Sequence, residues 1–240
     1  MAISCELLSC LQSGLVASCQ PVSGGPMDQK AIIVAMDQAA VAGGAVAVRI
    51  EGIENVRAVK SAISVPVVGL VKRDLADSAV RITALLSDVT DLAEAGADIV
   101  AYDATLRERP VSAVQLLEQI HQCGKVAMAD CSNEEDGMAA WQQGAELIGT
   151  TLAGYTEDLP VPLAPDLNLV KRLSQAGCYV VAEGRYNSPE LAAAAIAHGA
   201  FCVTVGSALT RVEHICQWFC EQIKAKALMQ EQGSGQVVTP

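Results

Sequence analysis

The chain is poor in aromatic residues and in positive charge. Of its 240 residues only 3% are aromatic, and 16 Lys and Arg stand against 27 Asp and Glu, which gives a net charge of −11. Binding of single-stranded nucleic acid needs aromatic stacking surfaces and basic grooves. A strongly acidic protein also repels polyanions and anionic membrane surfaces. We therefore expect a small-molecule ligand, no nucleic-acid partner and no membrane association.

Signals for secretion and for metal binding are also missing. The N-terminal stretch carries Glu6 and no basic region, and no apolar run reaches the roughly 18 residues of a membrane span. The nine cysteines form no CxxC and mostly lie in apolar runs, which is typical of reduced core thiols in a cytoplasmic protein. Because His121, His198 and His214 are far apart in polar stretches, we predict no metal site.

The strongest positive signal is a regular alternation of short apolar segments with longer amphipathic ones. Apolar segments predict eight strands, at 15–19, 45–50, 67–71, 98–102, 125–129, 146–150, 178–182 and 201–205. Helices are predicted between and after them, near 28–42, 53–62, 88–95, 112–121, 134–143, 166–176, 188–198 and 211–227. A glycine just past a predicted helix precedes six of the strands, as expected for helix ends: Gly44, Gly96, Gly124, Gly144, Gly177 and Gly199.

Near-continuous apolar strands joined by helices predict a parallel sheet that is covered on its faces, and eight such units match a closed (β/α)8 TIM barrel. The alternative is a doubly wound open sheet. Against it, the first strand is followed by Ser-Gly-Gly-Pro (23–26), which does not satisfy the GxGxxG dinucleotide motif. We expect one barrel domain over residues 1–227 and a disordered tail over 228–240, which includes GSGQVVTP.

Polar residues that directly follow the strands are the candidates for chemistry, because a barrel carries its active site at the carboxyl ends of its strands. They are Gln20, Arg49, Lys72, Asp103, Asp130, Thr150, Thr151, Glu183, Gly206 and Ser207. Lys72 and Glu183 follow the third and seventh strands, which face each other in a ring of eight. An amine and a carboxyl group on opposite sides of a substrate suit inversion of a stereocentre. The structural alternatives are a Lys72 that extends to solvent and a Glu183 that pairs with Arg185.

Glycine turns follow the seventh and eighth strands, where barrels of this kind commonly bind phosphate. We predict phosphate contacts from Gly184, Arg185, Gly206 and Ser207. The structural alternative for Ser207 is that it forms the N-cap of the next helix. Arg211, further along the same segment, either reaches the substrate or forms a salt bridge on a helix surface.

The remaining charged candidates sit in or next to apolar strands. Arg49 requires a carboxylate partner if it is buried, and Asp130 is the candidate for that role or for binding a hydroxyl group. Asp103 lies near Arg107 and Arg109 and is expected to organise its own loop rather than to take part in catalysis.

Several segments in order resemble the bacterial N-acetylmannosamine-6-phosphate 2-epimerase family. The most specific are VKRD (71–74), AEGR (182–185) and VGSALTR (205–211), and the likeness reaches about residue 227. The resemblance implies a cytoplasmic (β/α)8 enzyme of amino-sugar and sialic acid catabolism. Such an enzyme interconverts N-acetyl-D-mannosamine 6-phosphate and N-acetyl-D-glucosamine 6-phosphate without a cofactor.

The resemblance also implies roles for individual residues. It makes Lys72 and Glu183 the acid–base residues, and it makes the following residues substrate contacts: Gln20, Arg49, Asp130 and Arg211. A mechanism with one base acting on both faces of the intermediate stays open. Two other functions remain as alternatives, a lyase that forms a Schiff base on Lys72 and a sugar-phosphate binding protein without activity. Apolar residues in the helix at 212–223 predict a homodimer.

Overall fold

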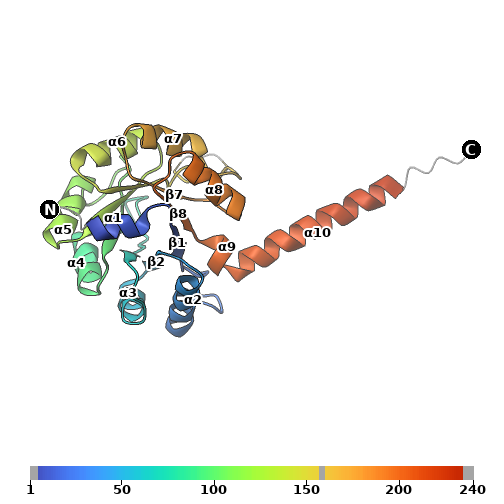
Figure 1. Ribbon diagram of the computed structural model, residues 1–240, viewed down its shortest axis with the longest axis horizontal. Coiled ribbons are helices and arrows are strands. Elements are labelled where there is room, and N and C mark those ends of the chain that lie inside the picture. Colours follow the sequence, from blue (N-terminus) through green and yellow to red (C-terminus); the bar gives the residue numbers. More distant parts are fainter. Residues whose placement is uncertain (1–4, 157–159, 235–240) are drawn as a thin grey trace, which may run out of the picture.

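The eight strands pair in sequence order, all in parallel, and close into a barrel (Figure 1). The computed structural model describes residues 5–156 and 160–234. The strands are β1 (Leu15–Ser18), β2 (Ala47–Glu51), β3 (Val67–Leu70), β4 (Ile99–Asp103), β5 (Val126–Asp130), β6 (Leu147–Gly149), β7 (Val180–Glu183) and β8 (Cys202–Val205). The predicted (β/α)8 fold is therefore confirmed, and the open sheet is excluded.

The described residues also form helices, and most of these surround the barrel as an outer layer (Figure 1). They are α1 (Cys5–Leu11), α2 (Lys30–Ala42), α3 (Ile53–Lys60), α4 (Leu86–Glu94), α5 (Ala113–Gln122), α6 (Glu134–Gln143), α7 (Leu167–Gln175), α8 (Pro189–Ala197), α9 (Ser207–Thr210) and α10 (Val212–Ser234). Helix α1 was not predicted. Its Leu11 is buried in the apolar filling of the barrel, so a segment that shows only a weak helical pattern is held by its tertiary packing.

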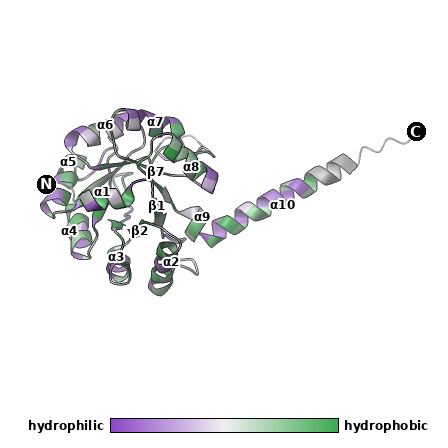
Figure 2. Ribbon diagram, in the orientation of Figure 1, coloured by the Kyte–Doolittle hydropathy of each residue, from purple (hydrophilic) through white to green (hydrophobic). Residues whose placement is uncertain are grey.

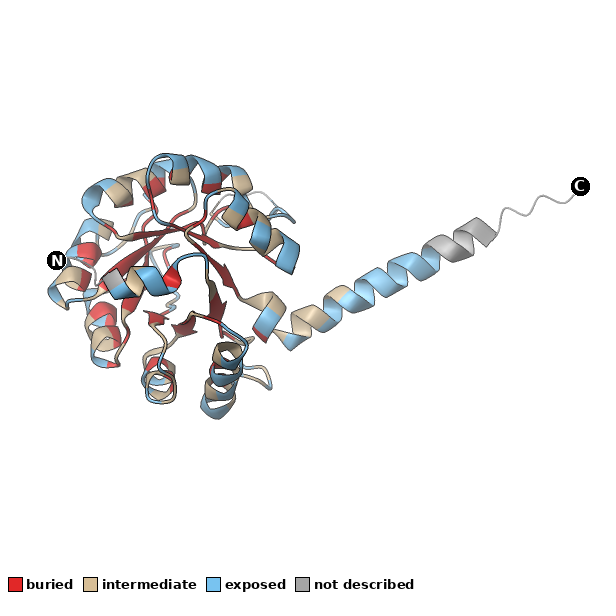
Figure 3. Ribbon diagram, in the orientation of Figure 1, coloured by how far each residue is buried: buried red, intermediate tan, exposed pale blue. Residues whose placement is uncertain are grey.

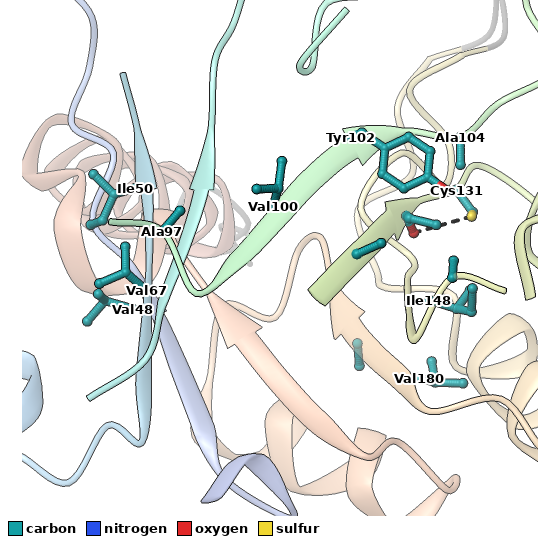
Figure 4. Packing of buried hydrophobic residues seen from close by; sticks show 14 of the residues in the cluster. Val48, Ile50, Val67, Ala97, Val100, Tyr102, Ala104, Cys131, Ile148 and Val180 are labelled. Atoms are coloured by element: carbon teal, nitrogen blue, oxygen red, sulfur yellow. Dashed lines mark hydrogen bonds between the residues drawn. The ribbon is translucent and has the colours of Figure 1, made fainter. Parts of the chain in front are cut away.

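Side chains alternate along each strand between two apolar layers. On β3, Val67 packs between the sheet and the helices, whereas Val68 and Leu70 fill the barrel interior. Figure 4 shows the outer layer, in which Val48 and Ile50 of β2 lie beside Val67. Continuing the same alternation past the end of each strand assigns the next polar residues to the barrel interior.

The helix ends follow the local signals in the sequence. All six glycines expected after helices have a positive φ, between 69° and 104°, a conformation that glycine adopts without strain. Asn133 and Ser188 accept hydrogen bonds from main-chain N–H groups in the first turns of α6 and α8. These caps satisfy N–H groups that a helix leaves unpaired.

The C-terminal region departs from the prediction. The helix expected over 211–227 is present as α10, which begins at Val212, and the short helix α9 precedes it. Helix α10 continues through residues 228–234, where disorder was expected, and residues 235–240 lie outside the described residues. Figures 1 and 2 show α10 projecting away from the barrel with polar and apolar residues along its length.

The cysteines are only partly the core thiols that the sequence predicted. The eight cysteines whose side chains the structure describes are free, and four of them are buried: Cys19, Cys131, Cys178 and Cys202. Cys10, Cys216 and Cys220 are exposed, and the last two lie on α10, which has no barrel strand to pack against. Within residues 5–156 and 160–234, no helix combines the length and apolar character that a membrane crossing requires.

Candidate active site

A cavity of about 530 Å³ opens at the carboxyl ends of the strands. The residues that line it come from most of the ring, and the candidate residues among them are Gln20, Arg49, Lys72, Asp103, Thr151, Glu183, Gly184, Arg185, Gly206, Ser207 and Arg211. Asp130 joins them through hydrogen bonds described below. The structure thus brings together all the residues that the sequence proposed for catalysis, substrate contact and phosphate contact.

A buried group of three charged side chains forms the floor of the cavity. Arg49 is 1% exposed and its terminal nitrogens contact both carboxylate oxygens of Asp130, with Nη2 2.6 Å from Oδ2 and Nη1 3.3 Å from Oδ1. The Nε of Arg49 also lies 3.4 Å from Oε1 of Glu183. A buried guanidinium needs such partners to offset its lost hydration. The predicted pairing of Arg49 with Asp130 is confirmed, and Glu183 pairs with Arg49 rather than with Arg185.

Glu183 is the carboxyl group of this floor that reaches the cavity. Its side chain is 14% exposed, against 0% for Asp130. Burial raises the pKa of Glu183 to about 7, although Arg49 and Lys72 act in the opposite direction. A carboxyl group that exchanges its proton near neutral pH is suited to general acid–base chemistry.

Lys72 projects from the end of β3 on the opposite side of the barrel mouth. Its Nζ donates a hydrogen bond of 2.7 Å to Oε1 of Gln20, and its main-chain N–H contacts Glu51. Partial burial lowers the pKa of Lys72, and the positive charges of Arg49 and Arg211 lower it further. The side chain is exposed to the cavity, so Lys72 faces a ligand rather than only bulk solvent.

Gln20 and Arg211 connect β1 to the segment after β8. The Nε of Arg211 donates to the main-chain oxygen of Gln20 at 2.9 Å, while the amide nitrogen of Gln20 donates to the hydroxyl of Ser18. The Gln20 amide is therefore oriented with its oxygen toward Lys72. This contact places Arg211 at the cavity wall and not in a salt bridge on a helix surface.

The two predicted phosphate loops lie at the same wall. Gly184 and Arg185 both have positive φ values, 103° and 65°, which turns the chain sharply after β7. The Arg185 guanidinium donates to the main-chain oxygens of Ala153 and Ala164, so its side chain holds the β6–α7 connection. Gly206 is the N-cap residue of α9 and has no side chain to cap the helix. Ser207 is the first residue of the helix, so the N-cap role considered for it is wrong.

Asp103 has the structural role that was expected from the sequence. It is 1% exposed, and its carboxylate accepts hydrogen bonds from Arg107, Arg109 and the main chain of Thr105. These bonds fold the loop after β4 across one side of the cavity. Asp103 also lines the cavity, but its oxygens are occupied by this network.

The role of Thr151 was not identified from the sequence, and the mostly basic lining of the cavity was not predicted either. Thr151 was noted only as polar, yet its hydroxyl donates to Asp130 at 2.6 Å. Its position two residues past inward-facing Gly149 was the available signal.

The lining of the cavity is strongly cationic for so acidic a chain. It contains two acidic side chains and six basic ones: Arg49, Lys72, Arg81, Arg107, Arg185 and Arg211. Such a cavity suits an anionic ligand.

The sequence matches one protein family over most of its length. The family is described as "Putative N-acetylmannosamine-6-phosphate epimerase", and the match covers residues 33–225. The chain belongs to this family. Epimerases are isomerases, and the sequence resemblance noted above is thereby confirmed.

Individual relatives agree with the family assignment. The chain is 58% identical over 217 residues to a Photobacterium profundum protein with the description "Putative N-acetylmannosamine-6-phosphate 2-epimerase", which covers 90% of this chain and 92% of the relative. A Salmonella typhimurium relative with a matching description is 59% identical over 211 residues, covering 88% and 93%.

Solved structures support the same fold. The N-acetylmannosamine-6-phosphate 2-epimerase from Clostridium perfringens superimposes with a TM-score of 0.88 at 32% identity, over 92% of this chain and 98% of that one. Thiamine phosphate pyrophosphorylase from Pyrococcus furiosus has a TM-score of 0.58 at 16% identity and covers 84% of this chain and 88% of its own. The second likeness concerns the barrel fold alone.

Proposed function

We propose that this member of the epimerase family interconverts N-acetyl-D-mannosamine 6-phosphate and N-acetyl-D-glucosamine 6-phosphate, in amino-sugar and sialic acid catabolism. The observation that carries the proposal is the placement of Lys72 and Glu183 on β3 and β7, four strands apart in the ring, at one cavity. The two sugars differ only in the configuration at C2. A group on each face of that carbon can remove the proton on one side and return a proton on the other.

The chemistry follows from the acidity of the carbon beside a carbonyl group. In the open-chain sugar, C2–H lies next to the C1 aldehyde, so one of the two side chains removes the proton. The C–H electron pair then forms the C1=C2 bond and the carbonyl pair moves to O1. Protonation of C2 on the other face by the second side chain re-forms the aldehyde with inverted configuration. A general acid or base contributes about 10²–10⁴-fold to such a step.

The charges of the site support the enolate intermediate. Arg49 is held behind Glu183 by Asp130, so its positive charge is fixed before the substrate arrives. We assign Gln20, Arg49, Asp130 and Arg211 to orientation of the substrate, and the positive charges of Arg49 and Arg211 to stabilisation of the charge on O1. Groups that are already oriented toward developing charge stabilise it without reorganisation.

The phosphate of the substrate is assigned to the two glycine turns. Main-chain N–H groups at Gly184, Arg185 and Gly206, together with the Ser207 hydroxyl, provide donors at the wall between β7 and β8. The Arg185 guanidinium is already bonded to main-chain oxygens, so its expected contribution comes from the main chain. Binding energy from the phosphate orients the reacting carbon without taking part in the proton transfer.

The test is proton NMR of N-acetylmannosamine 6-phosphate with the protein in D2O. We expect loss of the C2 proton signal as the epimer appears, because the abstracted proton exchanges with solvent. Binding without exchange would support a sugar-phosphate binding protein instead. A borohydride-trapped covalent adduct on Lys72 would support a Schiff-base lyase, and either result would overturn the proposal.

We also propose that the enzyme is a homodimer and that it works in the reducing cytoplasm. Helix α10 exposes Phe219 and Ile223, each by about two thirds (68% and 67%), and Figure 3 shows most of α10 as exposed. A second copy of the chain would cover this surface. Sedimentation velocity should give a dimer that dissociates in the Phe219→Glu, Ile223→Glu variant, and a monomeric wild-type protein would contradict the assignment. The free cysteines support the reducing compartment.

A further inference from the structure

Four side chains at the barrel mouth form a closed ring of contacts. Arg49 contacts Asp130, Asp130 accepts from Thr151, Thr151 Oγ1 lies 3.4 Å from Oε2 of Glu183, and Oε1 of Glu183 lies beside Arg49. Three members of the ring already have assigned roles. Thr151, which follows β6, does not.

The main chain of Glu183 is fixed independently of this ring. The Thr150 hydroxyl donates to the main-chain oxygen of Glu183 at 2.9 Å and accepts from its N–H at 3.1 Å. With the backbone held from both sides, the orientation of the carboxyl group is the remaining variable. That orientation is set by what each of its two oxygens faces.

The two oxygens of Glu183 face opposite kinds of group. Oε1 lies 3.4 Å from Nε of the positively charged Arg49, and a positive charge beside an oxygen makes protonation of that oxygen less favourable. Oε2 faces the Thr151 hydroxyl, which can either accept or donate. A proton on the acid form of Glu183 is therefore more favourable on Oε2 than on Oε1.

A hydroxyl group has only one proton to donate, and Thr151 has two carboxyl neighbours. In the structure it donates to Asp130 at 2.6 Å, so its lone pairs are available to a protonated Glu183. When Glu183 is ionised, rotation of the hydroxyl lets the same proton serve Oε2. Thr151 can thus form a hydrogen bond with Glu183 in both protonation states.

We propose that Thr151 is a positioning residue that holds Oε2 of Glu183 as the proton-carrying oxygen throughout the epimerisation. The residue does not touch the reacting carbon and acts through Glu183. This inference rests on the proposed function, because it assigns Thr151 to the same proton transfer.

The experiment compares Thr151→Val, which removes the hydroxyl and keeps the shape, with Thr151→Ser, which keeps the hydroxyl. We expect kcat of Thr151→Val to fall by about 10-fold to 100-fold with KM changed less than threefold, and Thr151→Ser to stay within a fewfold of wild type. Thr90→Val on α4 is the matched control, since Thr90 is remote from the cavity and bonds only within the helix layer.

The pH dependence separates positioning from a purely structural role. Hydrogen bonding by Thr151 lowers the pKa of Glu183 against the effect of burial, so the limb of the kcat profile that reports Glu183 should move to higher pH in Thr151→Val. Loss of packing alone would lower the unfolding temperature without moving that limb. If Thr151→Val does not fold, Thr151→Cys, with a much weaker donor, provides the same comparison.

Each outcome decides the matter. Wild-type rates and an unchanged pH profile in Thr151→Val or Thr151→Cys would overturn the role of Thr151, as would a Thr151→Ser variant as slow as Thr151→Val. Absence of C2 proton exchange in the wild-type protein would overturn the proposed function instead, so the two failures are distinguishable.

Discussion

The protein buries two acidic side chains in very different surroundings, and the contrast shows what makes a buried carboxyl group functional. Glu183, at the end of β7, lies beside Arg49 and opens onto the cavity. Asp37, in the middle of α2, is 0% exposed, and neither carboxyl oxygen has a hydrogen-bond partner among the described residues. Its polar neighbour is the Cys19 thiol, whose pKa is raised by burial and then by Asp37.

Burial raises the pKa of both groups to about 7. A shifted pKa therefore does not by itself identify an active-site residue. Glu183 differs from Asp37 in its access to a ligand and in the positive side chains around it, which stabilise its ionised form. Asp37 has neither access to a ligand nor positive side chains around it, so its burial lowers the stability of the protein and contributes nothing to catalysis.

The largest effect is expected at Glu183. Glu183→Gln removes the exchangeable proton while Arg49 keeps its contact with Asp130, so kcat should fall by about 10²–10⁴-fold in a protein that remains folded. Turnover measured by NMR and unfolding followed by circular dichroism check the two parts. The exposed Glu118→Gln on α5 is the matched control. A rate close to that of wild type would remove Glu183 from the mechanism.

The pH–rate profile of the wild-type protein tests the role of Lys72, the partner of Glu183 across the cavity. With one partner protonated and the other not, the profile of kcat/KM should be bell-shaped. The acid limb should lie near pH 7, from Glu183, and the alkaline limb below 10.5, because partial burial lowers the pKa of Lys72. Replacement of Lys72 by Met should remove most of the activity at every pH. A profile without an alkaline limb would argue for a single base.

Asp37 should affect stability and not turnover. Its pKa is raised in the folded protein from 3.8 to about 7, so the folded state binds the proton more tightly than the unfolded state. Stability from this group is complete below about pH 4 and is lost as the pH rises through 7. Asp37→Asn should therefore be more stable than wild type at pH 8, by roughly 1–3 kcal/mol, with a smaller gain at pH 5.

Urea unfolding at the two pH values measures this difference, and Asp77→Asn in an exposed loop is the control. Equal changes at pH 5 and pH 8 would show that Asp37 does not titrate in this range. A large loss of kcat in Asp37→Asn would instead connect α2 to the active site.

The smallest effect is expected from removal of divalent metal. The positive charge around Glu183 comes from side chains of the chain itself, Arg49 and Lys72, so incubation with EDTA should leave kcat unchanged. Inactivation that Mg²⁺ or Zn²⁺ reverses would show that the charge at the mouth is not supplied by these residues alone.

Much of the site could be predicted because strand alternation is a local property. Every second residue along a strand faces the same side, and this alternation continues just past the end of the strand. Lys72 therefore faces inward two residues after Leu70, and Asp130 faces inward two residues after Met128. The pairing of Arg49 with Asp130 was predicted, but the other contacts between such residues were not. A pair between Glu183 and its sequence neighbour Arg185 was the structural alternative to a catalytic Glu183, but Arg185 folds back onto the β6–α7 connection and leaves Glu183 to Arg49.

The sequence by itself determined the order of strands and helices, the closure of the barrel and the set of side chains at its mouth. These depend on apolar periodicity and on glycines at helix ends, which act over a few residues. Only the tertiary structure decided that Glu183 meets Arg49, that neither carboxyl oxygen of Asp37 has a hydrogen-bond partner among the described residues, and that α10 leaves the barrel (Figure 1). Those outcomes depend on distances between strands and helices far apart in the chain, and no local pattern encodes them.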